Sequence, residues 1–141
     1  MHDPKLLDQL ENRPTRPFQG AVFRALRGGL DPLTPSTRGG RWAPPGGISV
    51  LYTSLDREGA IAEVAFHWSQ LTPWPAKPLD VHEIAAAAEK TLRLIEADLP
   101  ALGVNPASYK APKYRRTQEI GAVVEFLGCD GLIVPSARWN C

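Results

Sequence analysis

A chain of 141 residues, 43% hydrophobic and 22% charged, has the size and composition of one globular domain with its own core. Its 16 Lys and Arg and 15 Asp and Glu leave a formal charge of +1, without the basic excess that marks many nucleic-acid-binding proteins. No apolar run approaches the roughly 20 residues that cross a bilayer, so the composition also argues against a membrane protein.

The N-terminus and the cysteine content indicate a cytoplasmic protein. The first residues carry a charge every few positions and lack the apolar core and cleavage site of a secretory signal. Cys129 and Cys141 are too few for a disulfide framework, and we expect both to remain thiols. His2, His67 and His82 lie at no metal-ligand spacing with one another or with cysteine, so the sequence predicts no metal site.

The first predicted elements are a short helix and a strand. Asp3 is a suitable N-cap, a proline follows at the first helical position, and leucines recur at helical spacing. Residues 20–26 alternate as in a strand that places Val22, Arg24 and Leu26 on one face. Arg24 is charged on a face that is otherwise apolar, which makes it a candidate functional residue.

A loop rich in glycine and proline follows over residues 28–47 and is interrupted by one Arg-Trp pair. We expect this loop to close into a strand over residues 48–53. Ser54 or Asp56 then caps a helix that ends near Gln70. The predicted buried stripe of that helix consists of Ala60, Ile61, Val64, Ala65 and Trp68.

The segment between residues 79 and 95 allows two interpretations. Residues 79–84 and 91–95 are typical of strands, whereas the four alanines between them are equally compatible with a helix. Residues 98–113 are predicted to be mostly loop.

A helix and a strand are predicted to end the chain. The helix begins at Arg116 or Thr117 and ends at Leu127, because Gly128 is a typical C-terminal residue. The strand covers residues 131–136. The inward-facing residues of the helix are Ile120, Val123, Val124 and Leu127.

These elements predict the fold class and the domain organisation. Helices and strands alternate irregularly and without a repeat, which favours an α+β fold with a mixed, mostly antiparallel β core flanked by helices. No domain boundary is visible, so we predict a single domain over residues 1–141. Residues 1–19 form its N-terminal helix and lead-in, and residues 20–141 form its core.

The sequence lacks the motifs of two common kinds of site. The segment GGRWAPPGG at 39–47 lacks the lysine, the spacing and the strand-loop-helix context of a phosphate loop or a dinucleotide fingerprint. Ser136 lies in no nucleophile elbow, and no His and Asp combination presents itself as its activating system. The sequence therefore predicts neither a Rossmann site nor a serine hydrolase.

Other short motifs follow one another through nearly the whole chain. They are FR at 23–24, GGRW at 39–42, YTS at 52–54, IAE at 61–63 and GLIVPSAR at 131–138. In this order and spacing they resemble the RES-domain family, which is named for an arginine, a glutamate and a serine. These residues fall here on Arg41, Glu63 and Ser136. The GRW motif of the family often continues with asparagine, whereas this chain has Ala43, so the role of that amide is absent or supplied elsewhere.

The resemblance implies a fold, an activity and a partner. Members that resemble this chain are toxins of bacterial toxin–antitoxin pairs with a fold similar to ADP-ribosyltransferases. They consume NAD+ as substrate by cleaving its nicotinamide-ribose bond, and some modify a protein instead. The resemblance also implies a co-expressed antitoxin that blocks the pocket, usually a small DNA-binding protein, and the toxin itself is not expected to bind nucleic acid or a membrane.

Under this resemblance, five residues receive roles. Loss of nicotinamide leaves an oxocarbenium-like ribose, and the carboxylate of Glu63 would stabilise the positive charge that grows there. Arg41 and Arg24 would bind the pyrophosphate through charge-assisted hydrogen bonds. Tyr52 offers a ring that stacks on nicotinamide and a hydroxyl that orients it, and Ser136 would hydrogen-bond the ribose or the amide.

The acceptor of the ribosyl group and the activity itself have alternatives. Water or inorganic phosphate can attack the ribose, and the sequence does not choose between them. Protein ADP-ribosylation uses the same NAD+ site, and a catalytically silent nucleotide-binding module is a third interpretation. His67 is a secondary candidate on the helix of Glu63, and Glu58 is the nearest alternative carboxylate.

Each candidate also has a purely structural interpretation. Arg24 would pair with a core carboxylate, and Tyr52 would only pack. Glu63 would face solvent on its helix, and Ser136 would only end a strand.

Overall fold

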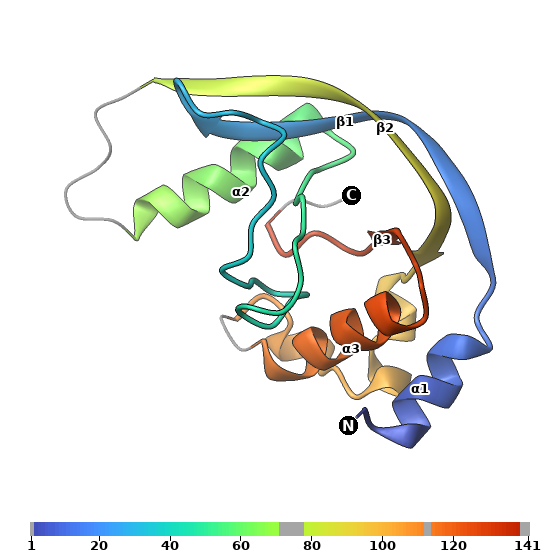
Figure 1. The fold of residues 1–141 in the computed structure, drawn as a ribbon. Coiled ribbons are helices and arrows are strands. Elements are labelled where there is room, and N and C mark those ends of the chain that lie inside the picture. The colour runs from blue at the N-terminus through green and yellow to red at the C-terminus, as the bar shows by residue number, and fades with distance from the viewer. Residues whose placement is uncertain (1, 71–77, 112–113, 139–141) are drawn as a thin grey trace. The chain divides into compact units, whose positions relative to one another are not determined.

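The computed structural model describes residues 2–70, 78–111 and 114–138, and within them the chain forms an α+β fold (Figure 1). This confirms the predicted fold class. Among the described residues, no helix has both the length and the apolar character needed to span a bilayer. The elements are α1 (Pro4–Glu11), β1 (Thr15–Arg27), α2 (Arg57–Ser69), β2 (Leu79–Arg93), the short 3-10 helices η1 (Glu96–Asp98), η2 (Pro100–Leu102) and η3 (Pro106–Ser108), α3 (Arg115–Phe126) and β3 (Gly131–Ile133).

The strands form one mixed sheet in the order β1-β2-β3. β1 and β2 are long and run in opposite directions (Figure 1). β3 pairs in parallel with the end of β2, with Thr91 opposite Gly131 and Arg93 opposite Ile133.

The chain divides into two compact units, and β1 and β2 contribute residues to both. Unit 1 comprises Met1–Phe18, Ser36–Val50 and Ala87–Pro135, and unit 2 comprises Gln19–Pro35, Leu51–Ala86 and Ser136–Cys141.

Unit 1 has an aliphatic core built around the contact between α1 and α3. The predicted N-terminal helix is confirmed: Asp3 caps it, its carboxylate accepting from the backbone N–H of Lys5 at 3.0 Å. Burial of each large aliphatic side chain in this core contributes about 1.5–3 kcal/mol to stability. The fully buried members are Leu6, Leu10, Leu92, Leu94, Leu99, Leu102, Ile120 and Val123.

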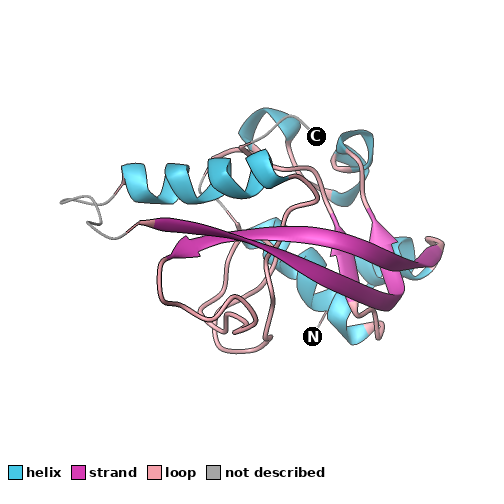
Figure 2. Ribbon diagram, turned by 90° about the horizontal axis from the view of Figure 1, so that it is seen from above, coloured by secondary structure: helices cyan, strands magenta, loops and turns pink. Residues whose placement is uncertain are grey.

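Unit 2 contains α2 beside its portions of β1 and β2, as Figures 1 and 2 show. The predicted helix bounds are confirmed, since Asp56 is the N-cap and Gln70 the C-cap. The predicted buried stripe is partly wrong: Ala60 is buried, but Ile61 and Ala65 are exposed. The second fully buried residue of α2 is a glycine, so this helix packs through its smallest side chains and hydrophobicity alone did not identify its inner face.

β2 replaces the two predicted strands, and the helical alternative for its alanines is wrong. Burial alternates between neighbouring residues over 82–89, the period of a strand. Alanine favours helices, but β2 lies between β1 and β3 in the sheet, and that pairing overrides the local preference.

The strand predicted over residues 48–53 is also wrong. Within the described ranges, this part of the chain is held by isolated antiparallel bridges, Val50 with Ser36 in unit 1 and Ser54 with Phe23 in unit 2. The residues between these bridges have the alternating sequence pattern of a strand, but among the described residues they pair with no neighbouring strand. Apolar alternation therefore marked a well-anchored loop.

The C-terminal predictions are largely confirmed. α3 begins at Arg115, one residue before the predicted start, and its predicted inward residues Ile120, Val123 and Val124 are buried. Leu127, also predicted to face inward, is the C-cap and is only half-buried. The loop predicted over 98–113 contains the short 3-10 helices η2 and η3. β3 is shorter than predicted and ends at Ile133.

Of the two cysteines, Cys129 is a free thiol, as predicted, and burial raises its pKa. Cys141 lies outside the described residues.

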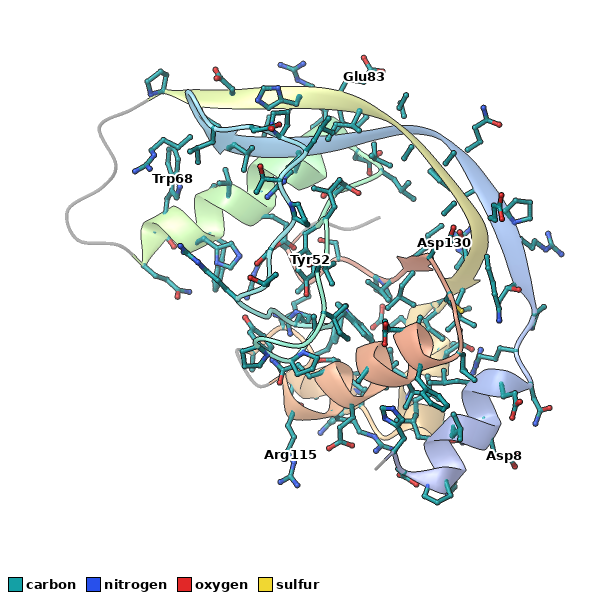
Figure 3. All side chains as sticks on the ribbon, in the orientation of Figure 1. Asp8, Tyr52, Trp68, Glu83, Arg115 and Asp130 are labelled. Atoms are coloured by element: carbon teal, nitrogen blue, oxygen red, sulfur yellow. The ribbon has the colours of Figure 1, made fainter. Side chains whose placement is uncertain are left out.

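Asp130 fastens β3 to β2 at the start of the parallel pairing (Figure 3). Its carboxylate accepts from the backbone N–H groups of Glu89 at 2.9 Å and Lys90 at 2.7 Å. These two bonds hold the pKa of Asp130 below its usual range. The carboxylate therefore adds stability above the pKa of an unfolded aspartate, and this contribution is lost as the pH falls through the lowered folded pKa.

We predict that Asp130→Asn lowers Tm at pH 7, because one carboxylate oxygen is replaced by an amide group that cannot accept. The difference from the native protein should shrink as pH falls through the folded pKa of Asp130, because the native carboxyl then also becomes protonated. Thermal unfolding between pH 7 and pH 2.5 measures this. Asp8→Asn, at an exposed position of α1, is the matched control, and an equal Tm loss there would contradict the assignment.

Candidate active site

Glu63 and Ser136 are brought together in unit 2, although they are far apart in sequence. Glu63 lies in the middle of α2, and Ser136 follows β3. The hydroxyl of Ser136 donates to Oε1 of Glu63 over 3.5 Å, a long hydrogen bond. The glutamate and serine predicted to act together are therefore neighbours, and the serine orients one carboxylate oxygen.

The Glu63 carboxylate remains open to solvent and to a ligand. Its side chain is 40% exposed, and Nε2 of His67, one helical turn onward, lies 3.9 Å from Oε2. The His67 ring is 63% exposed, so its attraction for Glu63 is weak even when the ring is protonated. The two carboxylate oxygens thus face different partners, Ser136 and His67.

Arg138, for which the sequence motifs predicted no role, holds the Ser136 segment against α2. Its guanidinium carbon lies 3.3 Å from the ring centroid of Phe66, a cation–π contact. Its backbone N–H also donates to the hydroxyl of Ser136 at 3.1 Å. Phe66 is three residues after Glu63, so the stack lies on the same side of α2 as the carboxylate. The only signal in the sequence is that Arg138 ends the motif that contains Ser136.

Tyr52 and Arg24 belong to unit 2 as well. Tyr52, labelled in Figure 3, is half-buried, and its hydroxyl oxygen is inaccessible to water. Two residues later, the backbone of Ser54 exchanges two hydrogen bonds with that of Phe23. Nη1 of Arg24 donates to the carbonyls of Pro32 and Thr34, both at 2.7 Å. Arg24 therefore braces the following loop, rather than pairing with a core carboxylate.

Arg41 belongs to unit 1 and stands at the corner of a tight turn. Gly40 and Ala43 pair across the turn, the N–H of Gly40 donating to the carbonyl of Ala43 at 2.9 Å. Gly39 has φ +84, and a Cβ there would lie 2.8 Å from the backbone nitrogen of Pro45, so only glycine fits. Gly39 thus serves the turn itself.

The guanidinium of Arg41 is held on one side by backbone carbonyls and two aromatic rings. Nη1 donates to the carbonyl of Tyr109, and to that of Ala111 at 3.1 Å. The guanidinium carbon lies 5.2 Å from the ring centroid of Tyr109 and 4.7 Å from that of Tyr114. Nε and Nη2 have no hydrogen-bond acceptor within the described part of the chain, which leaves one edge of the fork for an anion. Sequence reasoning missed both tyrosines, because nothing in their local sequence marks them.

A RES-domain family model matches residues 13–141, most of the chain. The chain belongs to the RES-domain family. The RES domain also matches a chain of the crystal structure of the M. tuberculosis MbcT–MbcA toxin–antitoxin complex with a TM-score of 0.84 and 22% identity. That match covers 96% of this chain and 79% of the other, so the two share a fold. No curated protein matches the sequence.

The stack of Arg138 on Phe66 predicts an energetic coupling in the RES domain. In a double-mutant cycle, Arg138→Ala and Phe66→Leu should couple by about 0.5–1 kcal/mol in urea unfolding, the range of a partly exposed cation–π pair. Arg57→Ala with Phe66→Leu is the control cycle, because Arg57 is an exposed arginine of the same helix. Equal coupling in both cycles would show that the stack contributes nothing specific.

Proposed function

We propose that this RES domain is the toxin of a bacterial toxin–antitoxin pair and degrades NAD+ at the nicotinamide-ribose bond. Membership of the family and the fold shared with a toxin–antitoxin complex support the class of protein. The observation that carries the proposed chemistry is the half-exposed carboxylate of Glu63 with the hydroxyl of Ser136 on one of its oxygens.

In the proposed reaction, the bond between C1′ of the ribose and the nicotinamide nitrogen breaks, and its electron pair leaves with neutral nicotinamide. Positive charge then grows on the ribose, and the ionised Glu63 stabilises it more in the transition state than in bound NAD+. Ser136 holds Oε1 of Glu63, so the carboxylate is oriented before substrate arrives. The acceptor oxygen forms the new bond to C1′. An attacking water releases one proton to solvent, whereas a phosphate dianion attacks through an oxygen that carries no proton.

The other candidate residues bind substrate in this proposal. Arg41 offers its Nε and Nη2 edge to the pyrophosphate, because its Nη1 is already engaged by carbonyls. Arg24 contributes less, because its main contacts brace a loop. Tyr52 stacks on the nicotinamide ring, and the hydroxyl oxygen of Ser136, whose proton is donated to Glu63, accepts a hydrogen bond from a ribose hydroxyl or the amide N–H. No metal takes part.

The reaction products identify the acceptor of the ribosyl group. Incubation with NAD+ in buffers with and without inorganic phosphate yields ADP-ribose if water attacks and its 1″-phosphate if phosphate attacks. Tagged NAD+ that labels a protein would instead favour ADP-ribosyl transfer at the same site. If the folded protein binds NAD+ but releases no nicotinamide under any of these conditions, the proposed function is contradicted and a catalytically silent binding module is favoured.

An NAD+-consuming enzyme harms the cell that makes it, so the proposal includes a cognate antitoxin. We expect this antitoxin to be a small DNA-binding protein. Expression of the RES domain alone should arrest growth and lower cellular NAD+. Co-expression of the product of the neighbouring reading frame should restore both, and failure to restore them would remove that product as the antitoxin.

We predict that Glu63→Gln lowers kcat for nicotinamide release by about two to three orders of magnitude, the range for loss of one preorganised electrostatic contact. NAD+ affinity and Tm should change little, because the amide keeps the size and most hydrogen bonding of the carboxylate. Glu58→Gln, an exposed glutamate of the same helix, is the matched control and should leave kcat unchanged. Near-native turnover by folded Glu63→Gln would exclude Glu63 as the catalytic carboxylate.

We predict that Arg41→Lys raises KM for NAD+ by about tenfold to a hundredfold while kcat falls much less, because phosphate contacts exist in both ground and transition states. Lysine keeps the charge but lacks the planar fork that stacks on two tyrosines and bonds an anion through its other edge. Arg24→Lys should raise KM less. Unchanged KM in both variants would remove the pyrophosphate role.

A further inference from the structure

The first turns of α3 lie directly against the backbone of the turn that carries Arg41. We call residues 38–43 the arginine loop. Three residues of α3 touch it, all within unit 1: Thr117, Gln118 and Gly121. Their spacing of one, three and four places them on neighbouring positions of one helix face.

Two side chains of this face hydrogen-bond the carbonyls of the arginine loop. The hydroxyl of Thr117 donates to the carbonyl of Arg41 itself, and Thr117 is only 3% exposed. The amide of Gln118 donates to the carbonyl of Gly40 at 3.0 Å. A buried carbonyl that loses its donor costs about 1–3 kcal/mol, so these bonds strongly favour one position of the loop.

Gly121 allows the helix backbone to touch the loop backbone. A Cβ at this position would lie 1.6 Å from the carbonyl oxygen of Trp42 and 2.7 Å from its carbonyl carbon. No real Cβ tolerates such distances, and the obstacle is backbone rather than a flexible side chain. Glycine inside a helix costs about 1 kcal/mol relative to alanine, so its presence in α3 needs a packing reason, which this contact supplies.

Arg41 is therefore held at both ends by α3 and the segment that leads into it. Its carbonyl accepts a hydrogen bond from Thr117. Its guanidinium donates to backbone carbonyls just before α3 and contacts the rings of Tyr109 and Tyr114. We propose that Thr117, Gln118 and Gly121 are positioning residues that preset the anion-binding edge of Arg41. The identity of the anion, the pyrophosphate of NAD+, rests on the proposed function; the positioning does not.

The physical consequence is an effect on affinity that exceeds any effect on turnover. A displacement of the loop moves the Nε and Nη2 edge of Arg41, which acts equally on bound substrate and transition state. A merely structural contact would instead lower Tm and leave the KM of the folded protein unchanged. The two roles are thus separable by measurement.

The test compares Thr117→Val with Thr117→Ser and with Thr91→Val. Valine keeps the shape of Thr117 but removes the hydroxyl bond, so KM for NAD+ and Kd for inorganic pyrophosphate should each rise about tenfold, with kcat within about twofold. Thr117→Ser keeps the hydroxyl and should restore both to within about threefold. Thr91→Val makes the same change at another buried threonine of unit 1, whose hydroxyl has no partner among the described residues, and should change neither.

Hydrogen exchange at the arginine loop gives a readout that does not depend on NAD+. The amides of Gly40 and Ala43, which bond across the turn, should exchange faster in Thr117→Val and in Gly121→Ala than in the native protein. Gly121→Ala should also lower Tm, although helix propensity alone predicts a gain of about 1 kcal/mol. If Gly121→Ala does not fold, Thr117→Val carries the test.

The outcomes separate this inference from the proposed function. Native exchange and native affinities in Thr117→Val would overturn the positioning role, and so would faster exchange with unchanged KM and pyrophosphate affinity. A native protein that binds pyrophosphate but releases no nicotinamide would contradict the proposed function while the positioning of Arg41 stands. A native protein that binds neither pyrophosphate nor NAD+ would overturn the anion-binding role itself.

Discussion

Unit 1 depends on α3 meeting two demands at once. One face of this helix buries Ile120 and Val123 in the aliphatic core, where α1 packs against it. The adjacent face must approach a loop backbone so closely that Gly121 has room for no side chain. Core packing fixes the helix, and the fixed helix in turn fixes the turn that carries Arg41. The position of the loop therefore depends on core packing as well as on its own glycines.

The two candidate arginines, Arg24 in unit 2 and Arg41 in unit 1, share one hydrogen-bonding arrangement. In Arg24 and in Arg41, Nη1 donates to two backbone carbonyls. A guanidinium has five N–H donors in a rigid plane, so one nitrogen can anchor the group while the opposite edge remains for a ligand. A lysine ammonium has a single nitrogen and cannot separate an anchoring edge from a ligand-binding edge in this way. This explains how one residue type serves both the fold and the proposed substrate site, and why neither arginine needs a carboxylate partner.

Glu63 shows how a candidate site residue can be identified from sequence while its structural environment cannot. Its identity came from the order and spacing of the RES motifs, and the bond to Ser136 agrees with that grouping. The stack of Arg138 on Phe66 beside it was not foreseen, because it joins residues 72 positions apart, one in α2 and one near the C-terminus. Tyr109 and Tyr114 were missed around Arg41 for the same reason.

The sequence by itself determined the helices α1, α2 and α3, whose causes are local, and it indicated the mixed α+β class and the RES-domain family. Caps, prolines and glycines act on their immediate neighbours, so their effects can be read along the chain. Only the tertiary structure decided the rest. The alanines became part of the single strand β2, and α2 packs through its small residues. Residues 48–53 form no strand and are held by isolated bridges. Each of these depends on which distant segment supplies the neighbouring backbone, and no local preference encodes that choice.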